Sequence, residues 1–245
     1  MASGALLCWA LVCGCQKGGE SVPVPAAGKG PALTEDEFTR RRLELRDKLA
    51  RQIKDPRVLD AMATIPRHKF VPEIELAKSY DNVPVPIGPK QTIPQPSLVA
   101  GMTELLEIKE TDRVLEVGTG SGYHAAVLGR LAAEVYTVEI RKSFKEAAET
   151  KLRDLEKRGI LTCKNMTVLQ GDGAKGWPEN APYDAILVTA AAAEVPDELI
   201  QQLKPGGRLL IPVGVRFQAL NLIRKLADGT TSNSTKDMVR FMRLE

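Results

Sequence analysis

Apolar residues first recur at helical spacing just beyond residue 33. A charged segment begins at Thr34, and Glu37 three residues later completes the pattern of a helix capping box. A second segment follows Asp55, a capping residue, with Pro56 in the first helical position and Pro66 at its end. The spacing predicts two helices, the first with an apolar side formed by Leu43, Leu45, Leu49 and Ile53.

The stretch 80–96 interrupts this helical pattern. It contains five prolines and two short runs rich in β-branched residues. Proline fixes φ and removes a backbone donor, so we predict a long, stiff, ordered loop here. Loops of this length within compact domains tend to be functional. Helix is predicted to resume over about 97–107.

Beyond residue 112, short apolar runs alternate with segments of helical spacing. The runs are bounded by turn residues and predict five buried strands, at 113–117, 135–139, 166–170, 183–190 and 207–214. The helical segments between them lie at 121–132, 141–158 and 195–203. This alternation is typical of βαβ units and predicts a parallel sheet with helices on both faces.

The end of the chain departs from this alternation. Residues 219–226 and 238–244 are predicted to form two antiparallel strands, with a turn at Asp228 and Gly229 between them. The fold class that we predict is α/β, a three-layer α/β/α, Rossmann-like sandwich. Helices precede the sandwich and the antiparallel strand pair closes it, so that residues 33–245 form a single domain.

Residues 1–32 are set apart by their composition. Residues 5–12 form an apolar run that is far shorter than the roughly 20 residues needed to span a bilayer. A stretch rich in Gly, Pro and Ser follows. Two interpretations remain open: a lipoprotein-type signal in which Gly14 precedes a lipidated Cys15, and a flexible leader without a fold of its own.

Overall composition narrows the function by exclusion. The net charge is +3, which gives no electrostatic argument for nucleic-acid binding, and we expect no nucleic-acid partner. Three of the four cysteines lie within the first fifteen residues, so the predicted domain, with Cys163 alone, cannot form an internal disulfide. Neither a CxxC nor an HExxH motif occurs, and we therefore expect no metal site.

A glycine-rich loop follows the first buried strand and leads directly into a helix. It reads EVGTGSG (116–122), and its glycines allow sharp turns and the close approach of a ligand. Ligands of such sheets bind beyond the carboxyl ends of the strands, where the strand order reverses. The spacing is GxGxG rather than GxGxxG, so a dinucleotide-dependent oxidoreductase is the weaker interpretation.

Three acidic residues stand at neighbouring strand ends. Glu116 precedes the loop, and Glu139 ends the second strand, where a carboxylate can bind both hydroxyls of a ribose. Asp172 ends the third strand, where it can meet an adenine amino group. Each acid alone would be interpreted as a helix cap or a solvated turn residue. Together they indicate an adenosine site without a pyrophosphate, which is the pattern of S-adenosylmethionine (SAM).

With these motifs the chain closely resembles the protein-L-isoaspartate (D-aspartate) O-methyltransferase family over essentially all of residues 40–244. The segment RVLEVGTGSGYHAAVL (113–128) is similar to the family's SAM loop and by itself indicates only a methyltransferase. More of the resemblance rests on three other blocks, which are similar to the family's N-terminal signature (57–72), its substrate loop (80–100) and its most distinctive segment (183–214).

The resemblance implies a SAM-dependent methyltransferase that acts on the α-carboxylate of isoaspartyl residues in damaged proteins. The ester would then collapse to a succinimide that partly reopens as normal aspartate. The implied partners are isoaspartyl-containing proteins and peptides, and the implied enzyme is a monomer. The implied cofactor-binding residues are Glu116, Gly118, Thr119, Gly120 and Gly122 around the methionine end, Glu139 at the ribose, and Asp172 with Gly173 at the adenine.

One position departs from the family pattern. The family usually reads QTISQP, with the serine as its active-site hydroxyl, whereas this chain reads QTIPQP, with Pro94. A carboxylate nucleophile has a reference pKa near 4 and needs no general base, so that hydroxyl would only position it. We therefore predict that Pro94 occupies the catalytic position and that Thr92 supplies a hydroxyl. The alternative is a SAM-binding module that recognises isoaspartyl peptides with weak or no catalysis.

Two further residues and the location of the protein complete the predictions. His124 is interpreted as a helix-face residue near the cofactor rather than an acid–base group. Arg216, just past a Pro-Val-Gly turn, either attracts a substrate carboxylate or is a solvated loop residue. Because SAM is made in the cytosol, we expect a cytoplasmic enzyme. The leader favours the alternative of an exported or lipid-anchored protein.

Overall fold

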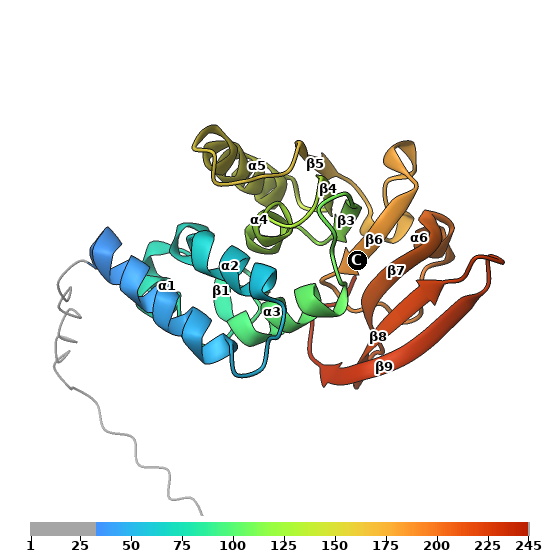
Figure 1. Cartoon of the computed structure of the whole chain (residues 1–245), viewed down its shortest axis with the longest axis horizontal. Coiled ribbons are helices and arrows are strands. Elements are labelled where there is room, and N and C mark those ends of the chain that lie inside the picture. Colours follow the sequence, from blue (N-terminus) through green and yellow to red (C-terminus); the bar gives the residue numbers. More distant parts are fainter. Residues whose placement is uncertain (1–32, 245) are drawn as a thin grey trace, which may run out of the picture. The chain divides into compact units, whose positions relative to one another are not determined.

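A seven-stranded sheet organises the part of the chain that the computed structural model describes, residues 33–244 (Figure 1). Its strands are β3 (Arg113–Val117), β4 (Glu134–Glu139), β5 (Asn165–Gln170), β6 (Tyr183–Val188), β7 (Leu203–Val213), β8 (Gln218–Lys225) and β9 (Thr231–Val239). They lie in the order β5-β4-β3-β6-β7-β8-β9. The five strands from β3 to β7 are parallel, and β8 and β9 add antiparallel to them. The predicted fold class is thereby confirmed.

The helices divide unequally between the two faces of this sheet. They are α1 (Glu35–Leu49), α2 (Pro56–Thr64), α3 (Pro96–Leu105), α4 (Tyr123–Leu128), α5 (Lys142–Lys157) and α6 (Asp197–Gln201). Alternate residues of a strand face opposite sides, so Val114 packs in the core cluster that contains side chains of α1 to α5. Leu115 faces the other cluster, which includes Leu199 of α6. The predicted leader, residues 1–32, lies outside the described residues.

The first two helices begin where the capping pattern predicted. The Thr34 hydroxyl accepts the backbone N–H of Glu37 at 3.2 Å, and the Asp55 carboxylate accepts that of Arg57 at 2.8 Å. Pro56 occupies the start of α2, where its missing N–H costs no hydrogen bond. Short polar motifs at the helix starts were therefore enough to locate this N-terminal helical part.

The proline-rich stretch differs from the predicted loop. It contains a short antiparallel hairpin of β1 (Val85–Gly88) and β2 (Gln91–Ile93), with Lys90 at a φ of 56° in its turn. Prolines are tolerated in this two-stranded sheet because both strands lie at an edge. The stretch is thus ordered, as predicted, but it is an arm that contains a hairpin and leads into α3 rather than a loop without strands.

The last predicted strand was wrong in its position. The turn at Asp228 and Gly229 forms as predicted, with Gly229 at a φ of 85°. Pairing starts directly after this turn, so β9 spans Thr231–Val239 and its side chains are mostly exposed. The prediction of a strand at 238–244 rested on an apolar run. The residues of β9 are mostly polar, because the strand lies at the exposed edge of the sheet, and so they gave no such signal. Residues 240–244 instead leave the sheet and reach the carboxyl ends of the parallel strands.

Candidate active site

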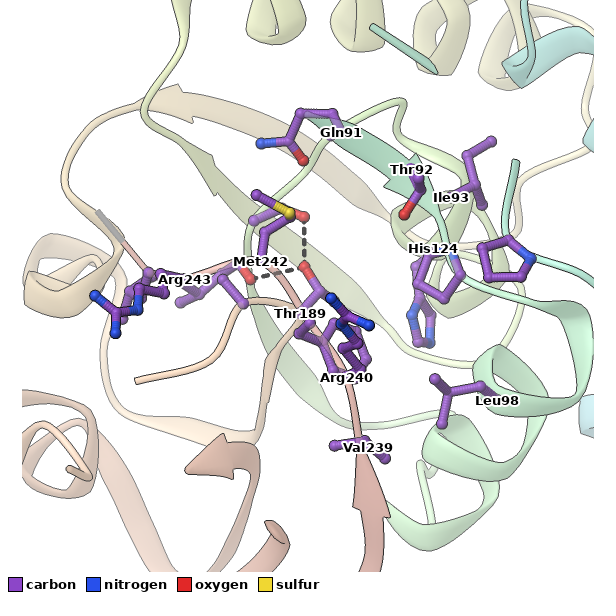
Figure 2. A pocket seen from close by; sticks show the side chains of 18 of the residues that line it. Gln91, Thr92, Ile93, Leu98, His124, Thr189, Val239, Arg240, Met242 and Arg243 are labelled. Carbon is purple, nitrogen blue, oxygen red and sulfur yellow. Dashed lines mark hydrogen bonds between the residues drawn. The ribbon is translucent and has the colours of Figure 1, made fainter. Parts of the chain in front are cut away.

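A cavity of about 750 Å³ opens at the carboxyl ends of the parallel strands. The strand order reverses between β3 and β6, and the residues that follow both strands line the cavity, as do those that end β4. This is the place at which open α/β sheets bind their ligands. Figure 2 shows two further walls, Gln91–Ile93 of β2 on one side and Val239–Arg243 of the C-terminal segment on another.

The glycine-rich loop is folded back onto the strand ends. The N–H groups of Gly118 and Thr119 both donate to the Val138 carbonyl, at 2.8 and 3.3 Å. Gly118 has a φ of 98°, and a Cβ built there would lie 2.5 Å from the Thr189 hydroxyl, so only glycine fits. Since these N–H groups bond within the protein, the loop does not offer them to a pyrophosphate as a dinucleotide-binding loop would.

Glu116 forms the buried floor of the cavity. Its Oε2 accepts the Thr137 hydroxyl at 2.5 Å, and Thr137 in turn contacts the Thr119 hydroxyl at 2.6 Å. Its Oε1 has no hydrogen-bond partner among the described residues. Burial raises the pKa of Glu116 to about 8 and the charge of Glu139 adds to the rise, against the Thr137 hydrogen bond. Glu116 is therefore mostly protonated at neutral pH.

Glu139 is also buried, but its carboxylate is held by backbone donors. Oε2 accepts the N–H of Gly120 at 2.8 Å, and Oε1 accepts that of Arg141 at 3.0 Å. Each oxygen keeps further lone pairs, and the side chain lines the cavity. The arrangement fixes the carboxylate at the end of β4 with free acceptor sites, which suits a pair of neighbouring hydroxyls.

The remaining predicted cofactor residues divide into those that line the cavity and those that do not. Gly118, Thr119, Gly120 and Gly173 line it, as do Glu116 and Glu139. The Asp172 carboxylate caps a short 3-10 turn by accepting the N–H of Ala174 at 2.9 Å, outside the lining. Gly122 starts α4 and faces α5, where an added Cβ would lie 3.2 Å from that of Ala148.

The hairpin brings both predicted catalytic positions to the cavity. Pro94 and Thr92 line it, and the Thr92 side chain is exposed with no hydrogen-bond partner in the described part of the chain. Figure 2 shows the Thr92 hydroxyl directed toward the space between β2 and the C-terminal segment. The hydroxyl is thus free to bond with a bound molecule.

Arg67 is the residue that sequence reasoning missed in this region. It is fully buried, its Nε donates to the Ser79 carbonyl and its Nη2 to the Pro94 carbonyl, both at 2.9 Å. Its guanidinium carbon lies 4.8 Å from the centre of the Tyr123 ring, at the start of α4. Arg67 therefore ties the hairpin to the cofactor side of the cavity. Arg67 stands beside His68 and Lys69 in the sequence, so nothing in the local pattern distinguished it as a buried charge.

His124 lines the cavity without being able to act as an acid at neutral pH. Its Nε2 lies 2.9 Å from the Thr103 hydroxyl, and that hydroxyl donates to the Val99 carbonyl at 2.8 Å, so His124 is the donor to Thr103. Burial lowers the pKa of His124 to about 3, and the charge of Arg67 adds to the effect. This geometry suits the predicted helix-face position.

The C-terminal segment is the second feature absent from the predictions of the site. The Gln218 side chain brackets Phe241, donating to its carbonyl at 3.0 Å and accepting its N–H. Leu244 donates to the Ala191 carbonyl at 2.9 Å, just beyond β6. These contacts place residues 240–244 along the cavity, and no local pattern in the sequence indicated them.

Two searches of the described residues were negative. Between residues 33 and 244, no group of three or more His, Cys, Asp and Glu side chains is placed to hold a metal ion. Over the same range, no helix has both the length and the apolar character needed to cross a bilayer.

Comparison with known proteins points to one family. The family model described as protein-L-isoaspartate(D-aspartate) O-methyltransferase matches residues 40–245. The chain is 52% identical over 192 residues to protein-L-isoaspartate O-methyltransferase 1 of Cupriavidus necator, covering 78% of this chain and 72% of that protein. It is 46% identical over 209 residues to the Geobacter metallireducens protein-L-isoaspartate O-methyltransferase, covering 85% of this chain and 94% of the relative.

Solved structures agree with the sequence comparison. A protein-L-isoaspartate O-methyltransferase superposes with a TM-score of 0.73 and 32% identity, covering 82% of this chain and 65% of that chain. A Plasmodium falciparum structure, described as a protein-L-isoaspartate O-methyltransferase in complex with S-adenosyl-L-homocysteine, gives a TM-score of 0.71 at 25% identity. The match covers 83% of this chain and 98% of that one.

Proposed function

The chain belongs to the protein-L-isoaspartate(D-aspartate) O-methyltransferase family, and we infer that its cavity is the site of that family's reaction. The enzyme transfers the methyl group of SAM to the α-carboxylate of isoaspartyl residues in damaged proteins. The observation that carries the assignment of the site is the pair of buried acids, Glu116 and Glu139, at adjacent strand ends beside a loop whose N–H groups are already bonded. That combination favours an adenosine without a pyrophosphate.

The residues present fit SAM. We propose that Glu139 binds the ribose hydroxyls, because its two oxygens are oriented by backbone donors and keep free acceptor sites. Glu116, with its unpartnered buried Oε1, faces the methionine end together with Gly118, Thr119 and Gly120. Gly173 lines the adenine end, where Asp172 supports the turn from outside the lining, and Gly122 lets the end of the glycine-rich loop pack closely against α5. When bound, SAM supplies an electrophilic methyl group on a sulfonium.

The task of the protein is then to position the substrate carboxylate. An isoaspartyl carboxylate is ionised at neutral pH, so no side chain needs to remove a proton before an oxygen bonds to the methyl carbon. Holding the reacting atoms in line can contribute roughly 7–11 kcal/mol to catalysis. We propose that the Thr92 hydroxyl donates to this carboxylate, since Pro94 has neither a hydroxyl nor an N–H to donate.

The product is a methyl ester, whose methoxy group is a far better leaving group than the oxygen of a carboxylate. The following backbone amide can displace methanol from it and form a succinimide, whose hydrolysis returns part of the material to normal aspartate. We propose that a single chain carries out the transfer, because Thr92, Glu116 and Glu139 of the same chain all line one cavity. We place the reaction in the cytoplasm, where SAM is made.

Methyl transfer from labelled SAM to an isoaspartyl peptide tests the proposal, with the normal aspartyl peptide of the same sequence as control. We expect base-labile label on the isoaspartyl peptide only. A chain that binds SAM and the peptide but transfers no methyl group would be the silent binding module. Equal labelling of both peptides would contradict the specificity for isoaspartate.

A further inference from the structure

Three arginines stand at the mouth of the cavity. Arg216 lies in the turn between β7 and β8, and Arg240 and Arg243 follow β9. All three line the cavity and are exposed, whereas Glu116 and Glu139 at its floor are almost fully buried. We call Arg216, Arg240 and Arg243 the mouth arginines. Figure 2 shows Arg240 and Arg243 on the C-terminal segment, across the cavity from β2.

The backbone that carries two of these arginines is fixed. Gln218 is buried and bonds to both the N–H and the carbonyl of Phe241, directly after Arg240. Ala191 pairs with Arg243 through two backbone hydrogen bonds, which join it to the neighbours of that residue, Met242 and Leu244. The side chains of Arg240 and Arg243 therefore start from held positions, and only their own torsions decide where the charges lie.

None of the mouth arginines has a charge partner in the described part of the chain. No ion pair or side-chain hydrogen bond joins any of the three guanidinium groups to another residue between 33 and 244. This contrasts with Arg40 and Arg41 on α1, which pair with Glu37. Three unpaired cations around one opening attract anions before contact is made.

The negative groups of the cavity do not cancel this charge. Glu116 is mostly protonated at neutral pH, because burial raises its pKa to about 8. Glu139 lies at the floor and is already bonded to two N–H groups. Among the described residues, Asp237 is the acid nearest to the mouth arginines along the chain; it also lines the cavity, and one of its oxygens accepts the N–H of Met238 at 2.7 Å. Among the described residues that line the mouth, three arginines therefore face one exposed acid, Asp237, which leaves a positive surplus there.

We propose that the mouth arginines select isoaspartyl sites that have acidic residues beside them in the substrate. This inference rests on the proposed function of the cavity, and it adds a charge preference to the substrate class. The occupant is a polypeptide segment whose Asp or Glu carboxylates, next to the reacting residue, meet Arg216, Arg240 and Arg243 as it enters. A reacting carboxylate is common to all substrates, so the charge of the residues beside it is the substrate property that these arginines can discriminate.

Three isoaspartyl peptides of one length, with acidic, neutral or basic residues flanking the isoaspartate, test this proposal. The full-length enzyme is assayed for kcat/KM with each peptide, at low and at high salt. We expect the acidic peptide to exceed the neutral one, and the neutral one the basic one, by about two- to fivefold per favourable contact. The ratios should shrink at high salt, because exposed charges are screened over about 10 Å at 0.1 M.

Variants that remove these charges, one at a time and together, then test whether the mouth arginines cause the preference for acidic peptides. Arg216→Gln, Arg240→Gln and Arg243→Gln should each lower the ratio of acidic to neutral kcat/KM, and the triple variant should bring it close to one. Lys236→Gln is the matched control, because Lys236 is an exposed cation of β9 that does not line the cavity. This variant should keep the wild-type ratio.

The outcomes separate this inference from the proposed function. Methylation of all three peptides at equal rates would overturn the inference and leave the function intact, whereas no methylation of any peptide would overturn the function itself. A higher KM for SAM in the arginine variants, with unchanged peptide ratios, would assign the arginines to the cofactor instead. Loss of the ratio in Lys236→Gln would show that overall charge, and not the mouth, sets the preference.

Discussion

The floor and the mouth of the cavity are built in different ways. At the floor, Glu116, Thr119 and Glu139 are almost fully buried, and hydrogen bonds to neighbouring strand ends hold each of them. At the mouth, Thr92 and Arg240 are exposed and their side chains have no partner among the described residues. The floor is therefore preorganised, whereas the mouth offers groups that a substrate can use.

This difference separates what binds the cofactor from what chooses the substrate. Removing one partner of a buried hydrogen bond or ion pair is costly, because the remaining group is left without a partner in a place that water does not reach. An exposed group costs little when it changes. Pro94 is partly buried, but its carbonyl still accepts a hydrogen bond from Arg67, so the mouth contains a proline at this position within an otherwise intact cavity. We expect substitutions at the floor to affect stability and SAM, and those at the mouth to affect peptides.

The largest expected effect comes from Arg67, the buried anchor of the mouth. Arg67→Met removes the donors of the Ser79 and Pro94 carbonyls, at about 1–3 kcal/mol each, so the free energy of unfolding should fall by about 2–6 kcal/mol. Urea unfolding measures this change. Arg40→Met is the control, since Arg40 is exposed and solvent screens its ion pairs with Glu37 and Glu44, so that they contribute little to stability.

Kinetic and binding measurements on a second Arg67 variant test whether this residue supports the mouth alone. Arg67→Lys keeps a charge and can donate to one of the two carbonyls, so it should fold and should raise KM for the isoaspartyl peptide more than the Kd for SAM. A variant whose SAM affinity falls as much as its peptide affinity would show that Arg67 supports the floor as well. Equal stability of Arg67→Met and Arg40→Met would mean that the hairpin is held by other contacts.

A pH-dependent effect is expected at the floor. The folded pKa of Glu116 is raised to about 8 from an ordinary 4.5, so between these pH values the folded state binds a proton that the unfolded state has lost. The contribution of Glu116 to the free energy of unfolding of the wild type is therefore largest below pH 4.5, and it is lost as the pH rises toward 8. The raised pKa corresponds to at most about 5 kcal/mol.

Glu116→Gln removes this titration while keeping the shape of the protonated acid. The variant should match the wild type near pH 4.5 and exceed it in unfolding free energy by a growing margin up to pH 8 to 9. Denaturant unfolding at pH 5, 7 and 9 measures the margin. A constant difference across this range would show that Glu116 ionises normally in the fold.

The same contrast explains how much could be predicted from the sequence. The floor comes from a continuous run of βαβ units, in which Glu116 and Glu139 stand at strand ends that apolar periodicity locates within one or two residues. The mouth is assembled from segments far apart in the chain. The contact of Arg67 with Pro94 and that of Gln218 with Phe241 depend on tertiary packing, which no local pattern records. The last strand was misplaced because β9 is polar and exposed, and its pairing with β8 leaves no apolar pattern in the sequence.

A smaller effect is expected on the affinity for SAM, and it differs between two acids that were predicted to bind the cofactor. Glu139→Ala should weaken SAM binding by about 1.5–3 kcal/mol, which is roughly 13- to 160-fold, through lost charge-assisted hydrogen bonds. Asp172→Ala should weaken it less, because the Asp172 carboxylate caps a turn outside the cavity lining. Isothermal titration calorimetry measures both. Tight binding of NAD with none of SAM would contradict the cofactor assignment.

The smallest expected effect lies at the mouth, at the position where the family carries a serine. If the loop hydroxyl only orients an ionised carboxylate, Pro94→Ser should raise the rate of methyl transfer by roughly two- to twelvefold, since one neutral hydrogen bond is worth about 0.5–1.5 kcal/mol. Thr92→Val, which keeps the shape of an exposed side chain that lines the cavity, should lower the rate by a similar factor. Rates with one isoaspartyl peptide at saturating SAM decide between the alternatives. Transfer by Pro94→Ser with none by the wild type would identify the natural chain as a binding module, and an unaffected Thr92→Val would remove Thr92 from the reaction.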